Sequence, residues 1–250
     1  MKSFFIVFFL FFLASCQSEV QPEHTASNVS EINYLMGNYK AEEILVKYTN
    51  PLEKTSVYLH KDTVAAFSRM IAAFEKEKNF PVKQHIYITS GFRSYEKQKE
   101  IWEGKFSGKR SMRVAVKGKT TEEINNLILE FSSAPGTSRH HWGTDFDINI
   151  LQNSYYQKGG RGQYIYQWLA DNAAKYGFCQ PYNSYELRNN KGYREERWHW
   201  SYKPVASSLT KKWIELWQKG EMDFQGKFMG SDSLGNKPLE YVQSVNQSCL

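Results

Sequence analysis

Stretches with helical periodicity and stretches with strand character follow one another along this chain without a regular βαβ alternation. Apolar residues recur at helical spacing over residues 62–78, whereas residues 85–89 and 144–150 have the composition or alternation of strands. A doubly wound parallel sheet requires strands and helices to take turns along the sequence. We therefore expect an α+β fold, a single domain with a small, mainly antiparallel sheet flanked by helices.

Capping residues indicate where several helices begin or end. Ser94 is a good N-cap for a second helix, and Thr120 with Glu123 forms the capping-box pattern that opens a third. Gly177 is expected to end a later helix, because glycine readily adopts the left-handed conformation found beyond helix C-termini. Residues 209–219 form the last expected helix, and the polar segment that follows it is expected to be an irregular tail.

The first residues have the features of a secretory signal peptide. Lys2 supplies a positive charge, residues 4–14 are apolar, and the small residue Ser15 precedes Cys16. The apolar run is too short to span a bilayer, which takes about 20 residues. Cysteine directly after Leu-Ala-Ser resembles the bacterial lipobox, which implies cleavage before Cys16 and attachment of lipid to it. An ordinary signal peptide with an incidental Cys16 is the alternative.

The chain carries a mild excess of positive charge, +6 at pH 7. Such a balance fits nucleic acid, anionic lipid or an anionic cell-wall polymer as a partner. Export removes most of the case for nucleic acid, so we expect no nucleic-acid partner. The Lys and Arg residues are spread along the chain apart from residues 105–119, which we interpret as a solvated loop.

The three cysteines exclude a disulfide-stapled miniprotein, and no C-x-x-C pair indicates a zinc ribbon or a thioredoxin-type motif. With Cys16 lipidated, Cys179 and Cys249 remain in an oxidising compartment, where a disulfide can form. The sequence does not show whether their geometry permits one.

Two short clusters of polar residues carry the chemistry. His140 is followed by Asp147 inside an apolar strand pattern, where an ionised carboxylate needs a partner or a metal. Asp145 and Asp147 share one face of that strand and repel each other unless a cation lies nearby. The second cluster supplies Glu196 and His199. Two imidazoles and one carboxylate suit a catalytic zinc with an open fourth position, although buried His and Asp residues also serve structural roles.

The patterns S-x-H-x-x-G-x-x-x-D and E-x-W-H resemble the signature of the VanY-type zinc D-alanyl-D-alanine carboxypeptidases. That family belongs to the LAS group, together with lysostaphin-type peptidases and the hedgehog domain. A third element, Ser-Gly-Phe-Arg-Ser followed by Gln98, precedes them and is similar to the family pattern S-G-[YF]-R-S-x-x-x-Q. The three elements occur in the family's order and span residues 90–199.

The resemblance implies that His140, Asp147 and His199 bind Zn²⁺ and that Glu196 is the general base. Neutral imidazoles and a carboxylate are donors that zinc accepts. A free carboxylate near zinc can take the proton of a bound water. The resemblance therefore implies that the chain is a zinc metallopeptidase.

The resemblance also implies that Arg93 binds substrate and stabilises the developing oxyanion, while Gln98 and Ser138 hold polar groups of the substrate. A guanidinium suits this role because it stays charged and offers forked donors. Asp145 departs from the carboxypeptidase pattern, since G-x-D-x-D resembles related murein endopeptidases instead. His141 stands at no ligand position of the motif, and a structural role is expected for it.

The expected function is a zinc-dependent peptidoglycan peptidase, a D-alanyl-D-alanine carboxypeptidase that removes terminal D-Ala from stem peptides. A murein endopeptidase of the same group and a non-catalytic peptidoglycan-binding lipoprotein are the alternatives. The expected organisation is a lipoprotein signal peptide at 1–15, a lipidated cysteine and flexible tether at 16–35, a peptidase domain at 36–220 and a C-terminal extension at 221–250. The expected location is the cell envelope, anchored in a membrane by lipid and facing the periplasm or cell wall; the oligomeric state is not indicated.

Overall fold

The computed structural model describes residues 29–77, 80 and 83–250. The expected signal peptide and the lipidation site Cys16 therefore lie outside the described residues. Among the residues that are described, no helix is both long enough and apolar enough to cross a membrane.

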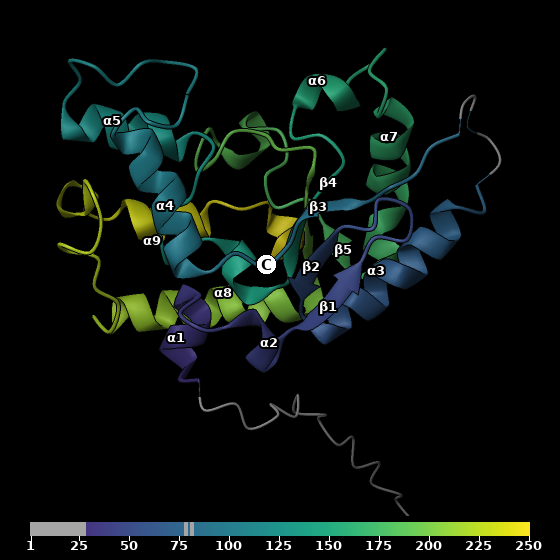
Figure 1. The fold of residues 1–250 in the computed structure, drawn as a ribbon, viewed down its shortest axis with the longest axis horizontal. Coiled ribbons are helices and arrows are strands. Elements are labelled where there is room, and N and C mark those ends of the chain that lie inside the picture. Colours follow the sequence, from purple (N-terminus) through teal and green to yellow (C-terminus); the bar gives the residue numbers. More distant parts are fainter. Residues whose placement is uncertain (1–28, 78–79, 81–82) are drawn as a thin grey trace, which may run out of the picture.

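A four-stranded antiparallel sheet forms the centre of the molecule (Figure 1). Its strand order is β3-β4-β6-β5, with β3 (Ile88–Ser90), β4 (Asp145–Ile148), β6 (His199–Tyr202) and β5 (Phe178–Cys179). A separate antiparallel hairpin consists of β1 (Val46–Thr49) and β2 (Ser56–Leu59). The expected small, mainly antiparallel sheet is confirmed.

Helices cover the sheet from several sides. In Figure 1, α3 and α7 lie to the right of the sheet, and α4, α5 and α9 lie to its left. The α-helices are α1 (Glu31–Met36), α2 (Ala41–Ile44), α3 (Lys61–Phe74), α4 (Tyr95–Phe106), α5 (Thr121–Leu129), α6 (Asn153–Tyr156), α7 (Gln163–Asn172), α8 (Lys203–Gln218) and α9 (Lys237–Gln243).

The expected capping residues lie where the sequence places them. The Ser94 side chain accepts a hydrogen bond from the backbone N–H of Lys97 at the start of α4. Thr120 and Glu123 form a complete capping box at the start of α5. Gly177 adopts φ +85° and ends the short 3-10 turn that extends α7. These local signals are read correctly because each depends only on residues a few positions apart.

Several element boundaries differ from those expected, and the helix expected over residues 62–78 ends at Phe74. The strand expected over residues 85–89 pairs with β4 only over Ile88–Ser90. The last long helix, expected to begin near residue 209, begins at Lys203 and carries Pro204 in its first turn. Proline is tolerated there because the first N–H groups of a helix have no partner within the helix.

Two apolar clusters fill the two sides of the molecule. One joins α3 and α7 to the sheet, with Phe67, Phe146 and Phe178 among its fully buried side chains. The other joins α4, α5, α8 and α9 around Trp102 and Trp213. Burial of such side chains contributes about 1.5–3 kcal/mol each relative to exposure. The four-stranded sheet therefore lies between two packed cores.

The segment after residue 220 differs from the expected irregular extension. It contains α9, and its Phe224, Phe228 and Val242 side chains are buried in the same cluster as α4 and α8. Its end is joined to β5 by a disulfide between Cys179 and Cys249, whose Cα atoms lie 5.6 Å apart. The last 30 residues are therefore part of the folded domain.

The end of the expected tether also differs. Ser30 caps α1, and Leu35 is fully buried against the α8 side of the core. Trp142 Nε1 donates a hydrogen bond to the Leu35 carbonyl oxygen at 3.0 Å. The folded domain therefore begins at about residue 30 rather than 36.

Candidate metal centre and catalytic cavity

Three side chains from the two polar clusters meet at the centre of the four-stranded sheet. β4 and β6 pair so that Asp147 lies directly opposite His199. His140 lies in a 3-10 turn, Arg139–Trp142, just before β4. One potential donor atom of each residue lies within 4.8 Å of the others, and all three residues are buried. The structure therefore brings together the three residues predicted to bind a metal.

Gly143 directs the chain from His140 into β4. It adopts φ +68°, and a Cβ at this position would lie 2.8 Å from the Leu45 side chain and 2.9 Å from the His60 backbone nitrogen. Only glycine accepts both the left-handed backbone and this close approach without strain. This geometry explains why a glycine stands at the last position of the S-x-H-x-x-G pattern.

Hydrogen bonds on the far sides of the two imidazoles leave one nitrogen of each free for a metal. His140 Nδ1 donates to the carbonyl oxygen of Gly91 at 2.7 Å, so Nε2 carries the lone pair. His199 Nε2 donates to the carboxylate of Asp145 at 3.0 Å, so Nδ1 is the nitrogen that would offer its lone pair to a metal. These two free nitrogens lie 3.4 and 3.2 Å from carboxylate oxygens of Asp147.

Asp147 gives the clearest indication that a cation belongs here. Its Oδ1 is buried and makes no hydrogen bond with the described residues, although His199 Nδ1 lies 3.2 Å away. Burial favours the neutral carboxyl, but His140 and His199 outweigh burial and hold the pKa of Asp147 well below its usual range. A buried ionised oxygen without a donor is costly unless a cation lies against it.

The chemistry of the donor set identifies the kind of cation. Zn²⁺ is commonly held by imidazole nitrogen and carboxylate oxygen, and catalytic sites supply three protein ligands and leave one position open. Ca²⁺ and Mg²⁺ prefer shells made of oxygen. The free nitrogens of His140 and His199 and the carboxylate of Asp147 therefore fit zinc.

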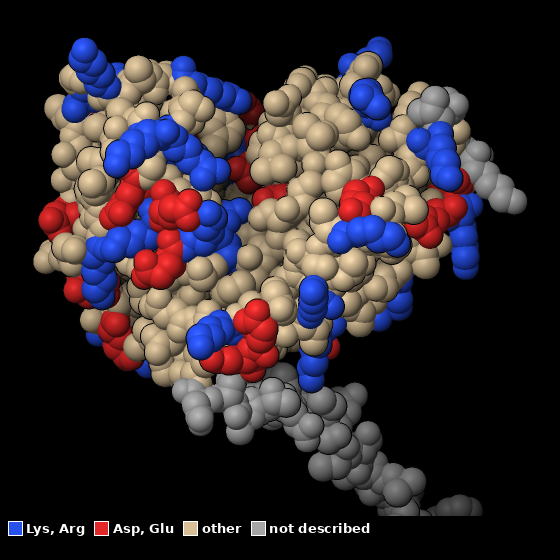
Figure 2. Space-filling view, viewed as in Figure 1, with Lys and Arg blue, Asp and Glu red and all other residues tan. Residues whose placement is uncertain are grey.

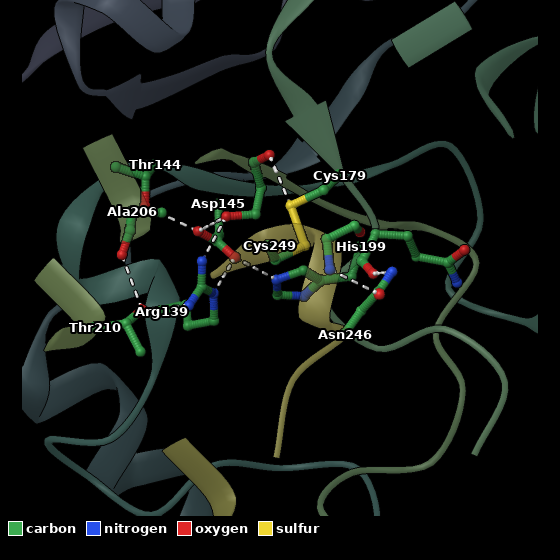
Figure 3. The surroundings of a disulfide bond; sticks show 12 residues. Arg139, Thr144, Asp145, Cys179, His199, Ala206, Thr210, Asn246 and Cys249 are labelled. Atoms are coloured by element: carbon green, nitrogen blue, oxygen red, sulfur yellow. Dashed lines mark hydrogen bonds and ion pairs between the residues drawn. A yellow bond between two sulfur atoms is a disulfide. The ribbon is translucent and has the colours of Figure 1, made fainter. Parts of the chain in front are cut away.

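Asp145 is fully buried beside these donors, and its charge is compensated (Figure 3). Arg139 Nε donates to its Oδ2 at 2.9 Å, and the hydroxyls of Thr144 and Ser201 each donate to its Oδ1 at 2.8 Å. Burial raises the pKa of Asp145, but Arg139 and then His199 outweigh it and hold the pKa well below its usual range. Asp145 therefore stays ionised and orients the imidazole of His199.

Glu196 enters the same cavity from the segment before β6. Its Oε2 lies 3.4 Å from His199 Nδ1, and its backbone N–H donates to the Tyr182 carbonyl oxygen at 2.9 Å. Burial raises the pKa of Glu196, an effect that His199 partly offsets. A carboxylate with a raised pKa beside the metal donors is well placed to accept a proton. The neighbouring Glu195 instead pairs with Arg197 at 3.0 Å.

Arg93 reaches the cavity from the loop after β3. Its Nη1 donates to Gln98 Oε1 at 2.9 Å, and its Nη2 donates to Ser90 Oγ at 3.2 Å. Nη2 also lies 3.8 Å from Asp147 Oδ2. These contacts hold a fixed guanidinium beside the metal donors, where it can stabilise developing negative charge.

Comparison with known protein families shows to which family this chain belongs. Residues 56–205, more than half of the 250-residue chain, match the family model VanY, D-alanyl-D-alanine carboxypeptidase. The chain belongs to the VanY family. The matched segment contains the metal donors, Glu196 and Arg93, so the geometry described above is that of a VanY-family site.

Individual relatives cover different shares of the chain. The Bacillus subtilis (strain 168) protein YodJ is 28% identical over 189 residues, which are 72% of this chain and 60% of YodJ. A D-alanyl-D-alanine carboxypeptidase of Enterococcus faecalis is 30% identical over 121 residues, 48% of this chain and 41% of the relative. The chain thus spans less than two thirds of the length of either curated relative.

One solved structure among those similar to this chain is a mutant of the vancomycin-resistance D,D-pentapeptidase VanY from a VanB-type cassette, in complex with Zn(II). It is 22% identical, covers 70% of this chain and 86% of its own, and has a TM-score of 0.46.

Two residues that the VanY resemblance assigns to substrate lie away from the cavity surface. Gln98 is fully buried, and its amide nitrogen donates to the Ser133 carbonyl oxygen at 2.7 Å while its oxygen holds Arg93. Ser138 is 1% exposed and precedes the turn that carries His140. The structure brings neither into the lining of the cavity, and Gln98 acts on the site through Arg93.

His141 has the structural role expected for it. It is fully buried; Nδ1 donates to the Arg93 carbonyl oxygen at 2.6 Å, and Nε2 accepts from the Gly136 N–H at 3.1 Å. Both ring nitrogens are therefore occupied within the protein. Burial lowers the pKa of His141 to about 3, so the ring is neutral at physiological pH.

Residues of the site that sequence reasoning missed come from three segments. The cavity at His140, Asp147 and His199 has a volume of about 220 Å³ and is also lined by Lys105, Arg110 and Tyr182. The Tyr182 ring packs against His199 with centroids 4.7 Å apart. Arg139 was missed as the partner of Asp145, although the paired carboxylates of β4 signalled that some cation was required. Nothing local in the sequence signals that Lys105 and Tyr182 reach this cavity.

Proposed function

We propose that this protein is a zinc D-alanyl-D-alanine carboxypeptidase that removes the terminal D-alanine from peptidoglycan stem peptides. The observation that carries the proposal is the convergence of His140, Asp147, His199 and Glu196 on one small cavity in a chain of the VanY family. The donor set suits zinc, and the carboxylate beside it suits a general base.

In this proposal the two free imidazole nitrogens and the Asp147 carboxylate hold the metal. Bound zinc supplies two chemical effects, a lowered pKa for a water molecule and polarisation of the scissile carbonyl. Asp145 and the Gly91 carbonyl oxygen fix the orientation of the two imidazoles through their far nitrogens.

Glu196 moves the proton. Its carboxylate accepts the proton of the attacking water and later delivers it to the leaving amine, which a raised pKa favours. Arg93 stabilises the negative charge that develops on the carbonyl oxygen, because its guanidinium is already held in place by Gln98 and Ser90.

The two alternatives have less support. A non-catalytic binding module would be expected to lack a metal ligand or the base, whereas all four side chains are in place. The G-x-D-x-D pattern pointed towards endopeptidases, but Asp145 is fully buried and paired with Arg139. Because Asp145 does not line the cavity, its presence does not favour one bond over another.

Digestion of purified muropeptides tests the proposal. The zinc-loaded protein is expected to shorten stem peptides that end in D-Ala-D-Ala by one alanine, read by mass spectrometry, and the Glu196→Gln variant is expected to leave them intact. Splitting of a cross-link would indicate the endopeptidase instead. Unchanged muropeptides with a fully zinc-loaded protein would contradict both.

We further propose that the protein is exported and anchored by lipid on Cys16, so that it meets its substrate in the cell envelope. The support is the order of Lys2, the apolar residues 4–14 and the Leu-Ala-Ser-Cys sequence. Two or three acyl chains on one cysteine give stable anchoring, whereas a single chain is marginal.

A further inference from the structure

Lys105 is a further positively charged side chain, besides Arg93, in the lining of the catalytic cavity. It lies in the last turn of α4 and lines the same cavity as His140, Asp147 and Glu196. Its Nζ donates to Ser132 Oγ, and Ser132 also lines this cavity. The ammonium group is therefore directed into the catalytic cavity, although the sequence placed residue 105 in a solvated loop.

The charge of Lys105 has no partner of opposite sign in the described residues. No carboxylate among them lies within ion-pair distance of Lys105 or of Arg110, which lines the same cavity. Nearby acidic side chains are already engaged, because Glu130 pairs with Arg194 and Glu100 pairs with Lys97. Burial lowers the pKa of Lys105 to about 8, and Arg110 adds to this effect, while Glu196 in the same cavity opposes it from beyond ion-pair distance. These two cations without ion-pair partners, the half-buried Lys105 and the exposed Arg110, favour an anionic ligand.

We propose that Lys105, with Arg110 beside it, binds the free C-terminal carboxylate of the peptide substrate and thereby selects peptides that end at the residue to be released. This inference rests on the proposed peptidase function. An ammonium paired with a carboxylate makes a charge-assisted hydrogen bond, about twice as strong as a neutral one.

The size of the cavity favours the terminal carboxylate over one further along the peptide. Its volume of about 220 Å³ equals that of about seven water molecules at ~30 Å³ each, room for the end of a peptide. A larger hollow of about 790 Å³ adjoins it, and Lys105, Phe131, Leu151 and Trp198 line both. Ser132, the partner of the Lys105 ammonium, lines only the smaller cavity.

The larger hollow leaves room for the rest of the substrate. It lies between the α4–α5 side of the molecule and the segment that carries α6, where Figure 2 shows the surface hollowed between two lobes. A peptide can therefore run from this hollow into the small cavity and end at Lys105. A chain that continues past the scissile bond, or one with an amidated end, would present no carboxylate there.

Peptide binding in the Glu196→Gln background tests this without depending on turnover. Three forms of one stem peptide ending in D-Ala-D-Ala are titrated by calorimetry: the free acid, the C-terminal amide, and a form whose internal carboxylates are amidated but whose end is free. Lys105→Met is expected to weaken binding of both free-ended forms by about ten-fold or more, the usual range for a hydrogen bond to a charged group, and binding of the C-terminal amide by less than about two-fold.

The exposed Lys109 provides the matched control, because it lines none of the cavities described here. Lys109→Met is expected to bind all three peptides as the parent does. Equal weakening of acid and amide by Lys105→Met, or no weakening at all, overturns the proposal. If Lys105→Met weakens binding of the free acid but not of the form with amidated internal carboxylates, Lys105 binds an internal carboxylate. That result also overturns the proposal.

Turnover by the protein with Glu196 intact separates this inference from the proposed function. If Lys105→Met hydrolyses the peptide and still prefers the free acid over the amide as the wild type does, the role of Lys105 is contradicted but the peptidase function is not. Selective binding of the free acid without any hydrolysis contradicts the peptidase function while the role of Lys105 stands. The zinc content and thermal unfolding of Lys105→Met are compared with the parent to show that the variant is folded.

Discussion

Two aspartates, two residues apart on β4, hold His199 from opposite sides. Asp145 accepts a hydrogen bond from Nε2 at 3.0 Å, and Asp147 lies 3.2 Å from Nδ1. Their side chains point to one face because alternate residues of a strand do so. The difference between them is the partner, since Arg139 compensates Asp145 while the Oδ1 of Asp147 has no hydrogen bond. One aspartate therefore orients a ligand, and the other is available as a ligand.

Replacement of Glu196 separates metal binding from catalysis. We expect Glu196→Gln to keep zinc and fold but to lose at least about a hundred-fold in rate, because glutamine matches glutamate in size yet accepts no proton. The rate is measured on a peptide ending in D-Ala-D-Ala, with zinc content measured in parallel. Glu195→Gln is the control and is expected to stay within about three-fold, because Glu195 pairs with Arg197 outside the site. Loss of activity in the Glu195 variant instead would mean that the base has been misassigned.

Replacement of Asp145 tests the support of the metal centre. Asp145→Asn removes the charge that pairs with the buried Arg139 and weakens the hydrogen bond that orients His199. We expect a loss of about 3 kcal/mol in the free energy of unfolding and about ten-fold weaker zinc binding. Denaturant unfolding and competition with a chelating dye measure the two effects. The control is Asp223→Asn, which alters an exposed pair with Lys227 and is expected to change neither stability nor zinc affinity. Unchanged zinc affinity in the Asp145 variant would contradict the role of Asp145 in orienting His199.

At the scale of elements, the sequence predicts what depends on near neighbours. Ser94, Thr120 and Glu123 cap helices because the groups that they contact lie three residues away. The metal donors could be assigned because the family motifs record a spacing that the strand pairing of Asp147 with His199 then explains.

What the sequence did not predict depends on contacts between distant segments. The buried Phe224 and Phe228 stand in a polar segment without helical or strand periodicity, so their packing against α4 and α8 leaves no local signal. The same holds for Lys105, which is 91 residues before Glu196 yet lines the same cavity. Residue 105 belongs to a basic run, and a basic run by itself indicates only a solvated surface.

The disulfide gives the C-terminal segment a stability role that can be measured. Cys179 and Cys249 are separated by 70 residues, and closing a loop of that size stabilises the fold by about 4 kcal/mol in the chain-entropy model. We expect the variant with Cys179→Ala and Cys249→Ala to lose about that amount in guanidinium unfolding. The oxidised wild type is expected to lose a similar amount when reduced, whereas the variant is insensitive to reductant. Equal unfolding curves for reduced and oxidised wild type would contradict this role.

At the scale of the whole molecule, the proposed lipid on Cys16 would tether the domain to a membrane. We expect the wild type to be labelled by palmitate in cells and to fractionate with membranes, and Cys16→Ser to lose both properties. Cys249→Ser is the matched control, because its cysteine lies at the other end of the chain in a disulfide. Equal labelling of the wild type and the Cys16 variant would show that the lipobox resemblance is misleading.

Stability against pH is a property of the whole fold to which His141 contributes. Burial lowers the pKa of His141 from 6.5 to about 3 in the folded chain, while the unfolded chain keeps the ordinary value. Below pH 6.5 the unfolded state therefore binds a proton that the folded state does not. This contribution to stability is complete above pH 6.5, is lost as the pH falls, and stops changing once the pH is below about 3. Between pH 8 and pH 5 the expected loss is about 2 kcal/mol.

Two measurements check this contribution. The ¹⁵N shifts of the His141 ring are expected to show the neutral form with a proton on Nδ1 throughout the range from pH 8 to pH 5, because Nδ1 donates to Arg93 and Nε2 accepts from Gly136. The difference in unfolding free energy between pH 8 and pH 5 is expected to be smaller in His141→Gln than in the wild type by about 2 kcal/mol, since glutamine does not titrate. A ring that protonates near pH 6.5 in the folded protein would contradict the prediction even if the variant fails to fold. Such a result would also mean that the Gly136 N–H has lost its acceptor, and that the turn carrying His140 is held by other contacts.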